Sequence, residues 1–489
     1  MERADVAVVG GGPAGLAAVL VLAEHGADVV LVDEQARSGG QIYRQPPESF
    51  AATASAYASG RELLAAAERA AFRRLQRTLV WGVFEPDDEE AIRLNGSLPA
   101  PAWILALAGE SGTERLAVRH VLVATGAYDL PVAFPGWTLP GVMAAGGVQA
   151  FVKSEKLLPG RRFVLAGAHP LLLLVADQLL AAGAELAAVA LAQPRPRATD
   201  ALTTAARLRA RVAGLGAAAG PMLRLRRANV PVLFSHLVAA AEGGDAVEAA
   251  RLRPVDGAWR ATGEPDLRFD CDTLALGYGF VPSTELARQA GCAHSWRSAA
   301  GGWVTDHDEW QRASRPGISV AGEVGGVAGA EQAAAEGRVA AFGILHELGR
   351  LDTGEAIRLA APVRRRLRSL RRFSALVQER FEPQRAALAA LADGSTIVCR
   401  CENVTADELR SALEGHPHLG DVDAVKQLTR VGMGPCQGRF CQLTVTALTA
   451  VATGRSVAEL GPFTARPPVK PLALGRLADA WNDEHEVRM

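Results

Sequence analysis

The stretch ADVAVVGGGPAGLAAVLVLAEHGADVVLVDE, residues 4–34, decides the fold of the N-terminal part of this chain. Its pattern predicts an apolar strand over Asp5–Val9, a glycine-rich turn, a helix over 13–25 and a second strand over Val29–Val32. A strand, a glycine turn, a helix and a second strand that ends in an acid predict a βαβ unit that binds a dinucleotide. Asp33, or its neighbour Glu34, is expected to accept hydrogen bonds from the ribose hydroxyls.

The glycine-rich turn has the spacing that close approach to a pyrophosphate requires. Gly10 permits the tight turn, Gly12 leaves the backbone open to the phosphates, and Gly15 lets the helix pack against the strand. Pro13 and Ala14 begin the helix, and the free N–H groups at its N-terminus attract phosphate. These five residues are therefore assigned to a cofactor site.

Three later stretches favour FAD as the dinucleotide. GGQIYR at 39–44 forms a loop that can pass near an isoalloxazine ring, and the apolar strand of HVLVATGAYDLP ends in a threonine-glycine turn. GISVAGEVGGVAGAEQAAAEGRVAA at 317–341 combines a strand, a glycine turn and a helix, whose N-terminus could support negative charge on a reduced flavin. Glu323 in that turn could bind the ribityl chain. The cofactor site is predicted to include Gly40, Gln41, Arg44, Val83, Thr125, Gly126, Gly322 and Glu323.

These motifs resemble the two-dinucleotide-domain flavoproteins, a family that includes disulfide reductases and ferredoxin reductases. The resemblance covers roughly residues 1–350 and implies an FAD domain interrupted by a second, NAD-type domain. One departure is Gly322-Glu323, where most relatives have Gly-Asp. The first cysteine is Cys271, which excludes a thioredoxin-reductase-type cysteine pair in the first 270 residues. Cys271 and Cys292 are expected to be small buried hydrophobic residues.

The middle of the chain repeats the strand–turn–helix–strand plan at residues 161–194, but its turn reads GAHPLL. The His169 side chain obstructs a pyrophosphate, Leu172 replaces the small residue that helix packing needs, and no acid ends the second strand. Arg195 and Arg197 could meet a 2′-phosphate, but they do not repair the turn. We therefore expect this domain to keep the fold without binding NAD(P)H.

Four of the six cysteines lie in two close pairs near the C-terminus. Cys399, Cys401, Cys436 and Cys441 follow the spacing C-x-C-x34-C-x4-C. Four thiolates in two close pairs can hold a [2Fe–2S] cluster or a zinc ion. A disulfide pairing is a third option and suits the cytoplasm least.

The cysteines lie within a pattern of short helices. Thr405-x-x-Glu408 is a capping box that predicts a helix over Ala406–Glu414, and a second helix is expected over Val422–Arg430. The stretch resembles the bacterioferritin-associated-ferredoxin type of [2Fe–2S] domain over roughly residues 395–450, although the commoner form ends in C-x2-C. The C-x4-C ending is similar to a variant in flavoprotein subunits of multisubunit amine and amino-acid dehydrogenases. Four basic residues could offset a cluster's charge or form ordinary solvated surface: Arg400, Lys426, Arg430 and Arg439.

The whole chain resembles the FAD- and [2Fe–2S]-containing large subunit of heteromeric dehydrogenases. Members include opine oxidases, proline or hydroxyproline dehydrogenases, hydrogen cyanide synthase and, more distantly, the sarcosine oxidase α subunit. The resemblance rests on VDEQARSGGQIYR, ATGAYDLPVAFPGWTLPGV and CRCE…GMGPCQGRFC. It implies a second, FAD-containing subunit that oxidises the C–N bond, and it allows a further partner, a small ferredoxin-like subunit.

The predicted fold class is α/β, with two Rossmann-like dinucleotide-binding domains and a small C-terminal helical [2Fe–2S] domain. The NAD-type domain interrupts the FAD domain. The expected segments are a first FAD-binding part at 1–155, an NAD-type domain at 156–270, a second FAD-binding part at 271–350, a helical linker at 351–394, the [2Fe–2S] domain at 395–452 and an extended tail at 453–489.

Composition narrows the class of function. A net charge of −1 argues against a nucleic-acid partner. The apolar run at 163–191 carries His169, Pro170, Asp177 and Glu185, which are costly in lipid, so no membrane span is expected. No secretory signal is visible, and the chain is expected to be cytoplasmic.

The predicted function is a FAD-dependent oxidoreductase that passes electrons from an amine or N-substituted amino acid through flavin and cluster to an acceptor. Two alternatives stay open. One is an NAD(P)H-dependent reductase that feeds electrons to a carrier, and the other is a non-catalytic electron-transfer or scaffold subunit. No histidine or acid near the predicted flavin stands out as a catalytic base.

Overall fold

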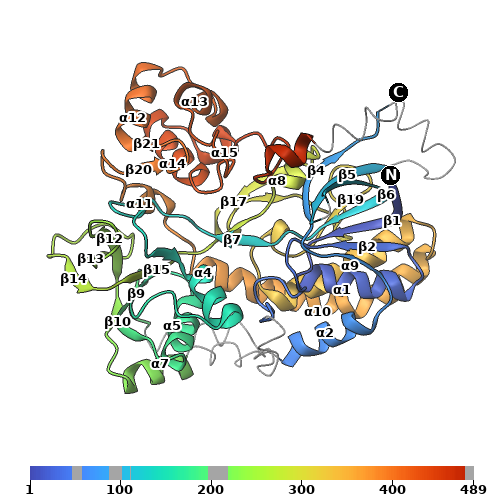
Figure 1. Cartoon of the computed structure of the whole chain (residues 1–489), viewed down its shortest axis with the longest axis horizontal. Coiled ribbons are helices and arrows are strands. Elements are labelled where there is room, and N and C mark those ends of the chain that lie inside the picture. The colour runs from blue at the N-terminus through green and yellow to red at the C-terminus, as the bar shows by residue number, and fades with distance from the viewer. Residues whose placement is uncertain (47–57, 88–101, 111, 197–218, 479–489) are drawn as a thin grey trace. The chain divides into compact units, whose positions relative to one another are not determined.

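The computed structural model describes residues 1–46, 58–87, 102–110, 112–196 and 219–478 (Figure 1). The chain divides into two compact units, each assembled from segments that are distant in sequence. Unit 1 comprises Met1–Tyr128, Val281–Gln378 and Thr464–Met489, and unit 2 comprises Asp129–Phe280 and Glu379–Phe463. None of the helices in the described ranges is long and apolar enough to cross a membrane.

Unit 1 contains the predicted N-terminal βαβ unit. Its strands are β1 (Glu2–Val9), β2 (Val29–Val32), β3 (Arg73–Leu75), β4 (Leu79–Phe84), β5 (Trp103–Gly109), β6 (Gly112–Val123), β17 (His294–Arg297), β18 (Gly302–Thr305) and β19 (Ile318–Val320). Its helices are α1 (Pro13–Glu24), α2 (Ala58–Arg69), α8 (Glu285–Gln289), α9 (Ala330–Glu347) and α10 (Thr353–Arg380), the last of which ends just beyond the unit boundary. The predicted first strand, helix and second strand are confirmed.

The main sheet of unit 1 has the order β3-β2-β1-β6-β5-β4, and β19 also pairs with β6. β1 runs parallel to β2 and β6, while β4, β5 and the first part of β6 form an antiparallel meander. β2 and the end of β1, residues 6–9, are apolar and buried because both faces of this part of the sheet are covered. Figure 1 shows α1, α9 and α10 on one face of this sheet.

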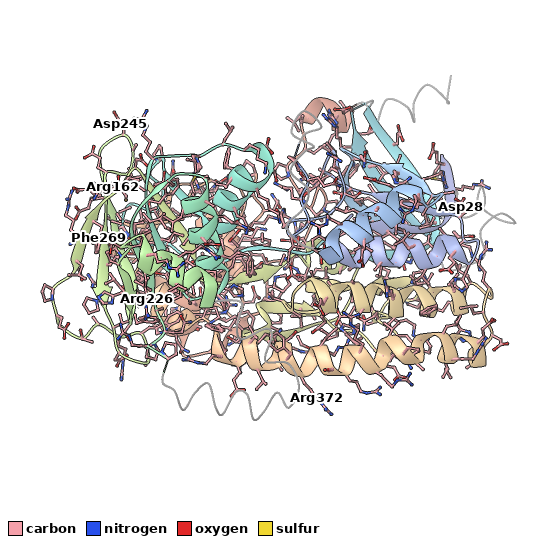
Figure 2. All side chains as sticks on the ribbon, turned by 90° about the horizontal axis from the view of Figure 1, so that it is seen from below. Asp28, Arg162, Arg226, Asp245, Phe269 and Arg372 are labelled. Carbon is pink, nitrogen blue, oxygen red and sulfur yellow. The ribbon has the colours of Figure 1, made fainter. Side chains whose placement is uncertain are left out.

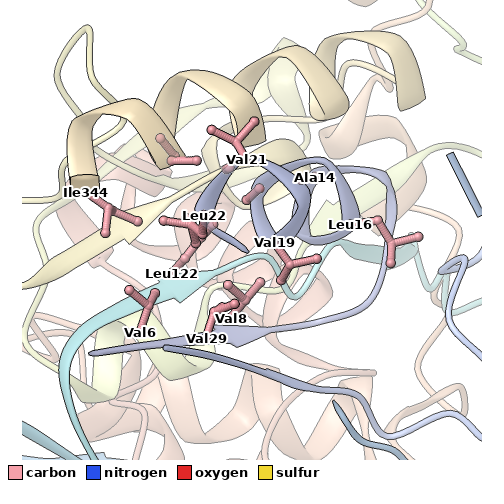
Figure 3. Packing of buried hydrophobic residues seen from close by; sticks show 14 of the residues in the cluster. Val6, Val8, Ala14, Leu16, Val19, Val21, Leu22, Val29, Leu122 and Ile344 are labelled. Atoms are coloured by element: carbon pink, nitrogen blue, oxygen red, sulfur yellow. The ribbon is translucent and has the colours of Figure 1, made fainter. Parts of the chain in front are cut away.

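The core of unit 1 lies between the parallel strands and two helices. Val6 and Val8 of β1, Leu22 of α1, Leu122 of β6 and Ile344 of α9 are buried and packed together (Figure 3). α1 is apolar around most of its circumference because it lies between the sheet and α9. This packing holds the glycine-rich turn at the carboxyl end of β1, where dinucleotides bind in such sheets.

Unit 2 contains a parallel sheet of order β11-β10-β9-β15-β8 and an antiparallel sheet of β12, β13 and β14. The strands are β8 (Val142–Ala144), β9 (Arg162–Gly167), β10 (Glu185–Leu191), β11 (Val232–Phe234), β12 (His236–Glu242), β13 (Ala249–Pro254), β14 (Leu267–Asp270) and β15 (Thr273–Gly277), and the helices of this part are α4 (Ala145–Ala150), α5 (Leu171–Ala181) and α7 (Ala219–Arg227). β7 (Ala127–Asp129) and β16 (Phe280–Pro282) cross the unit boundaries. The predicted fold class, with two Rossmann-like units, is confirmed.

The unit boundaries differ from the expected segment limits, among other places within the two FAD-binding parts. Residues 129–155 and 271–280, which we assigned to the FAD-binding parts, belong to unit 2. The reason is strand pairing: β15 runs parallel between β8 and β9 and so completes the second sheet.

The cysteine-containing segment is a small helical body within unit 2. Its elements are α11 (Arg385–Ala389), β20 (Ile397–Cys399), β21 (Val404–Thr405), α12 (Ala406–Gly415), α13 (Val422–Thr429), α14 (Gln442–Thr453) and α15 (Val457–Leu460). The predicted capping box is present, since Thr405 accepts the Glu408 N–H and Glu408 accepts the Thr405 N–H at 2.7 Å. The tail after this body lies along unit 1, where Val469 donates its N–H to the Trp81 carbonyl at 3.0 Å.

Candidate functional site

The glycine-rich turn of unit 1 is closed at both ends and open in the middle. Gly10 has a φ of +109°, and a Cβ there would lie 2.4 Å from the Ala124 carbonyl oxygen. A Cβ on Gly15 would lie 2.0 Å from the Gly10 oxygen. At Gly12, by contrast, the only described atom within 4 Å of such a Cβ is the Gly40 Cα, at 3.8 Å. The turn therefore leaves the space at Gly12 that a pyrophosphate needs.

The two acids after β2 have separate surroundings. Asp33 accepts the Gly11 N–H and the Gln35 N–H, each at 3.0 Å, and burial raises the pKa of its carboxyl. Glu34 instead forms an ion pair with Lys470 in the tail. Of the two predicted ribose ligands, Asp33 is the one that lies in the glycine turn.

The loop that begins at Gly39 lies against the same turn. Gly39 donates its N–H to the Gly11 carbonyl at 2.7 Å, and a Cβ on Gly40 would lie 2.9 Å from the Gly12 Cα. Arg44 is half-buried, and its Nε has no hydrogen-bond partner among the described residues. Gln41 is exposed. The structure thus brings Gly40 together with the turn.

The third predicted stretch also meets the first. A Cβ on Gly322 would lie 3.1 Å from the Cβ of Ala14 at the start of α1. Glu323 is half-buried and accepts the Gly329 N–H, while burial, helped by the nearby Glu336, raises the pKa of Glu323 to about 7. The side chain of Gln332, on the first turn of α9, is buried, and its Oε1 has no partner in the described part of the chain.

Thr125 and Gly126 are fixed by the segment after β16. The Thr125 hydroxyl donates to the Ser283 carbonyl at 2.6 Å, and Ser283 donates its N–H to the Gly126 carbonyl at 2.9 Å. No described atom lies within 4 Å of a Cβ placed on Gly126. The Thr125-Gly126 turn is therefore anchored from one side and open on the other.

Val83 has a partner that the sequence did not indicate. The side-chain amide of Gln289 accepts the Val83 N–H at 2.8 Å and donates to the Val83 carbonyl at 2.9 Å. Both backbone groups of Val83 are thus bound within unit 1, and its role toward a cofactor stays a prediction.

The residues of unit 1 fit a flavin dinucleotide. The space at Gly12 suits a pyrophosphate, and Asp33 stands where a ribose ligand is needed. Two buried polar atoms without partners in the described residues, Gln332 Oε1 and Arg44 Nε, are of the kind that a bound ligand satisfies.

The corresponding turn in unit 2 is closed by its own side chain. Leu171 at the start of α5 donates its N–H to His169 Nδ1 at 3.2 Å, and the N–H groups of Ala168 and His169 both donate to the Gly277 carbonyl. Burial lowers the pKa of His169 to about 4, so the ring is neutral near pH 7. Leu172 is fully buried. The amides that would face a pyrophosphate are thus already bound.

Only one of the two predicted arginines lies in the described part of the chain. Arg195 lies over the Phe234 ring at 5.6 Å, and Arg197 lies outside the described residues.

The structure gathers the four C-terminal cysteines into two hydrogen-bonded pairs. Cys399 pairs with Cys441, and Cys401 pairs with Cys436. All are buried except Cys401, which is half-buried. The four thiols are not arranged around one metal position. Within the described ranges, no set of three or more His, Cys, Asp or Glu side chains has such an arrangement.

The surroundings of the sulfurs fit a cluster better than isolated thiols. The Cys441 thiol, and after it the backbone N–H groups of Gly432, Glu402 and Cys401, donate hydrogen bonds to the Cys399 sulfur and lower the pKa of Cys399 to about 6. Amide hydrogen bonds to sulfur are a main means by which proteins tune iron–sulfur centres. The donor set is four thiols from two short loops, which suits [2Fe–2S] or zinc.

Several of the predicted basic residues lie close to an aromatic ring or a carboxylate. Arg400 lies 5.6 Å from the ring centres of both Trp137 and Phe440. Arg430 forms an ion pair with Glu402 at 2.9 Å, and Lys426 lies over the Phe463 ring at 5.4 Å. Arg439 is half-buried.

The remaining cysteines behave as expected. Cys271 and Cys292 are buried, and burial raises the pKa of each thiol to about 11. A thiol with such a pKa is a poor nucleophile, so neither residue is suited to redox work.

Comparison with known proteins agrees with this geometry. Residues 4–337 match the pyridine nucleotide-disulphide oxidoreductase family. The chain belongs to this family. Residues 393–480, which include the four cysteines, match the sarcosine oxidase A3 domain.

Two curated relatives and one solved structure match almost the whole chain. An opine oxidase subunit of Rhizobium meliloti is 36% identical over 98% of this chain and 99% of its own length. The hydrogen cyanide synthase subunit HcnB of Pseudomonas protegens is 33% identical over 95% of each chain. The crystal structure of L-proline dehydrogenase from P. horikoshii superposes with a TM-score of 0.67 at 20% identity, over 97% of this chain and 80% of that one.

The predicted family is therefore confirmed, and the chain is a FAD-dependent oxidoreductase. The two curated relatives are named as subunits of larger enzymes, which supports the expectation that this chain has a partner subunit.

Proposed function

We propose that this chain is the FAD- and [2Fe–2S]-containing subunit of a heteromeric oxidoreductase that oxidises a C–N bond of an amine or N-substituted amino acid. The observation that carries the proposal is the gathering of Cys399, Cys401, Cys436 and Cys441 in a protein that also has an open dinucleotide turn. The names of the relatives, opine oxidase and hydrogen cyanide synthase, support a small nitrogenous substrate.

The proposed FAD ligands lie around the turn of unit 1. Asp33 would bind the ribose, the N–H groups at the start of α1 would face the pyrophosphate, and Glu323 would meet the ribityl chain. The site as proposed comprises Gly10, Gly12, Pro13, Ala14, Gly15, Asp33, Gly40, Arg44, Thr125, Gly126, Gly322 and Glu323.

The four cysteines would hold the cluster, and the amides at Cys399 would stabilise its negative charge. When bound, FAD accepts two electrons together and a [2Fe–2S] cluster passes electrons singly. The closed turn at His169 supports a source of electrons other than NAD(P)H. We therefore assign substrate oxidation to a second, FAD-containing subunit, and a small ferredoxin-like subunit is a further proposed partner.

An anaerobic titration tests the direction of electron flow. The purified chain is mixed with NADH, and the flavin and iron–sulfur absorption bands are followed before dithionite is added. We expect the bands to stay oxidised with NADH and to bleach with dithionite. Immediate bleaching by NADH would instead identify an NAD(P)H-dependent reductase.

A second experiment tests the role of the partner. The chain is assayed with opines, proline and sarcosine, first alone and then with the co-expressed second subunit. Turnover is expected only for the complex. Turnover by the chain alone would place the substrate site here, and no turnover by any complex would favour an electron-transfer or scaffold subunit.

A further inference from the structure

Two polar side chains of α10 bind the loop that follows Gly322, and a third binds Glu336 on α9. The Ser374 hydroxyl donates to the Ala328 carbonyl at 3.1 Å, and the Gln378 amide donates to the Val327 carbonyl. Arg371 donates to Glu336 Oε1 at 3.2 Å. Positions 371, 374 and 378 share one face of a helix. Arg372, which follows Arg371, does not belong to this face and projects outward from α10 (Figure 2).

Glu336 links this face of α10 to the glycine turn. Its Oε2 accepts the Gly322 N–H at 3.1 Å, while its Oε1 accepts the Gln332 side-chain amide at 3.0 Å. Glu336 is only 4% exposed, and a buried carboxylate without a partner is costly. The guanidinium of Arg371 supplies the compensating charge.

α10 is held against α9 by apolar packing just beside these contacts. Ala335 and Val339 of α9 pack against Leu367 and Leu370 of α10 in a buried cluster. The polar stripe on α10 is therefore presented to the loop by a fixed helix and not by a mobile linker. Because Gly322 also lies against Ala14, the stripe acts on the wall of the dinucleotide site.

We propose that α10 is part of the FAD site. Ser374 of α10, and Glu336 of α9 with its partner Arg371 of α10, are positioning residues. They hold the loop from Gly322 to Gly329 in the shape that binds the cofactor. The sequence had predicted only a helical linker at 351–394. This inference rests on FAD binding by unit 1 and is independent of the proposed cluster, substrate and partner subunit.

The test measures FAD affinity apart from activity. Full-length Glu336→Ala, Ser374→Ala and parent chains are freed of FAD, and FAD is titrated back while flavin fluorescence is followed. Loss of a buried hydrogen bond to a charged group should weaken FAD binding by roughly tenfold for Glu336→Ala, and loss of a neutral one by roughly threefold for Ser374→Ala. Glu336→Gln keeps an acceptor for Gly322 and should fall between parent and Glu336→Ala.

The matched control is Arg366→Ala. Arg366 forms an ion pair with Glu331 at 3.2 Å, so it also joins α10 to α9, but its partner belongs to α9 and not to the loop from Gly322 to Gly329. We expect its FAD affinity to stay within twofold of the parent. The melting temperature of each FAD-free chain is recorded in parallel to separate loop positioning from general destabilisation.

Two results would overturn the proposal. One is parent-like FAD affinity in both Glu336→Ala and Ser374→Ala. The other is a loss of affinity that Arg366→Ala reproduces at an equal drop in melting temperature. If Glu336→Ala does not fold, Ser374→Ala alone decides between these results. A parent chain that binds no FAD would count against the flavin site itself and not against α10.

Discussion

The indole N–H of Trp137 donates a hydrogen bond of 2.6 Å to the carbonyl of Ile397, two residues before Cys399. Both residues belong to unit 2. Trp137 is only 7% exposed, so this bond is shielded from water, and Arg400 lies near the face of the same ring. The strand that carries the first cysteine pair is therefore tied to a loop some 260 residues earlier in the chain.

Trp137→Phe should loosen this strand. The change removes the indole N–H and keeps an aromatic ring, at a cost of about 1 kcal/mol for the lost hydrogen bond. Amide hydrogen exchange at residues 397–401, measured by mass spectrometry, should become about fivefold faster. Trp303→Phe is the control, since the Trp303 N–H is buried without a partner in the described residues. Unchanged exchange in Trp137→Phe would show that the bond is not needed to hold the strand.

Replacement of any one of the four clustered cysteines by serine should abolish the cluster. We expect about two irons and two sulfides per chain in the parent and a small fraction of that in Cys399→Ser or Cys441→Ser. Elemental analysis and the visible spectrum provide the measurement. Cys271→Ser and Cys292→Ser should keep the full iron content, because these residues lie more than 100 residues before the quartet in the chain and belong to neither of its pairs. One zinc and no iron in the parent would favour the structural-zinc alternative.

His169→Gly should not create an NAD(P)H site. The change frees the Leu171 N–H, but the N–H groups at 168 and 169 still face the Gly277 carbonyl. The rate of flavin reduction by NADH, measured by stopped-flow absorbance, should therefore change by less than about tenfold, because the glycine geometry remains wrong at position 172. Rapid reduction in the variant would show that the histidine alone closes the turn.

Glu323 should contribute a loss of stability of the FAD-free chain as the pH rises from 4.5 to 7. Its folded pKa of about 7 lies above the ordinary 4.5, so the folded chain keeps a proton that the unfolded chain has lost. The stabilisation is complete below pH 4.5 and disappears as the pH rises through 7. Its size is on the order of 2 kcal/mol after allowance for partial exposure.

Glu323→Gln should remove this contribution, which is measured as the difference between the variant and the parent in melting temperature against pH. Asp129, whose pKa burial raises to about 6, contributes with the same sign as Glu323 in both proteins, and His169 and His294, whose pKa values burial lowers to about 4, contribute with the opposite sign in both. Glu331→Gln, at an exposed position on the first turn of α9, should keep the parent profile. A parent-like profile in Glu323→Gln would mean that another group titrates in this range.

Several features could be predicted from the sequence because they depend on neighbours along the chain. The turn from Gly10 to Gly15, the helix after it and the Thr405–Glu408 capping box are all defined within a few residues. Their physical causes, namely backbone freedom at glycine, free N–H groups at a helix start and reciprocal caps, act over one or two helical turns. The two cysteine pairs were visible for the same reason.

Tertiary structure alone decided which distant groups complete these local features. Gln289 reaches Val83 across 206 residues, Arg371 reaches Glu336 across 35, and the Gly277 carbonyl meets the turn of α5 from a neighbouring strand. Such pairs leave no period or motif in the sequence, because one amide or arginine resembles any other until the fold places it. The sequence by itself therefore determined the glycine-rich turn, the obstructed turn at His169 and the cysteine quartet, whereas packing decided that the Gly277 carbonyl binds the amides of the obstructed turn and that α10 contacts the loop after Gly322.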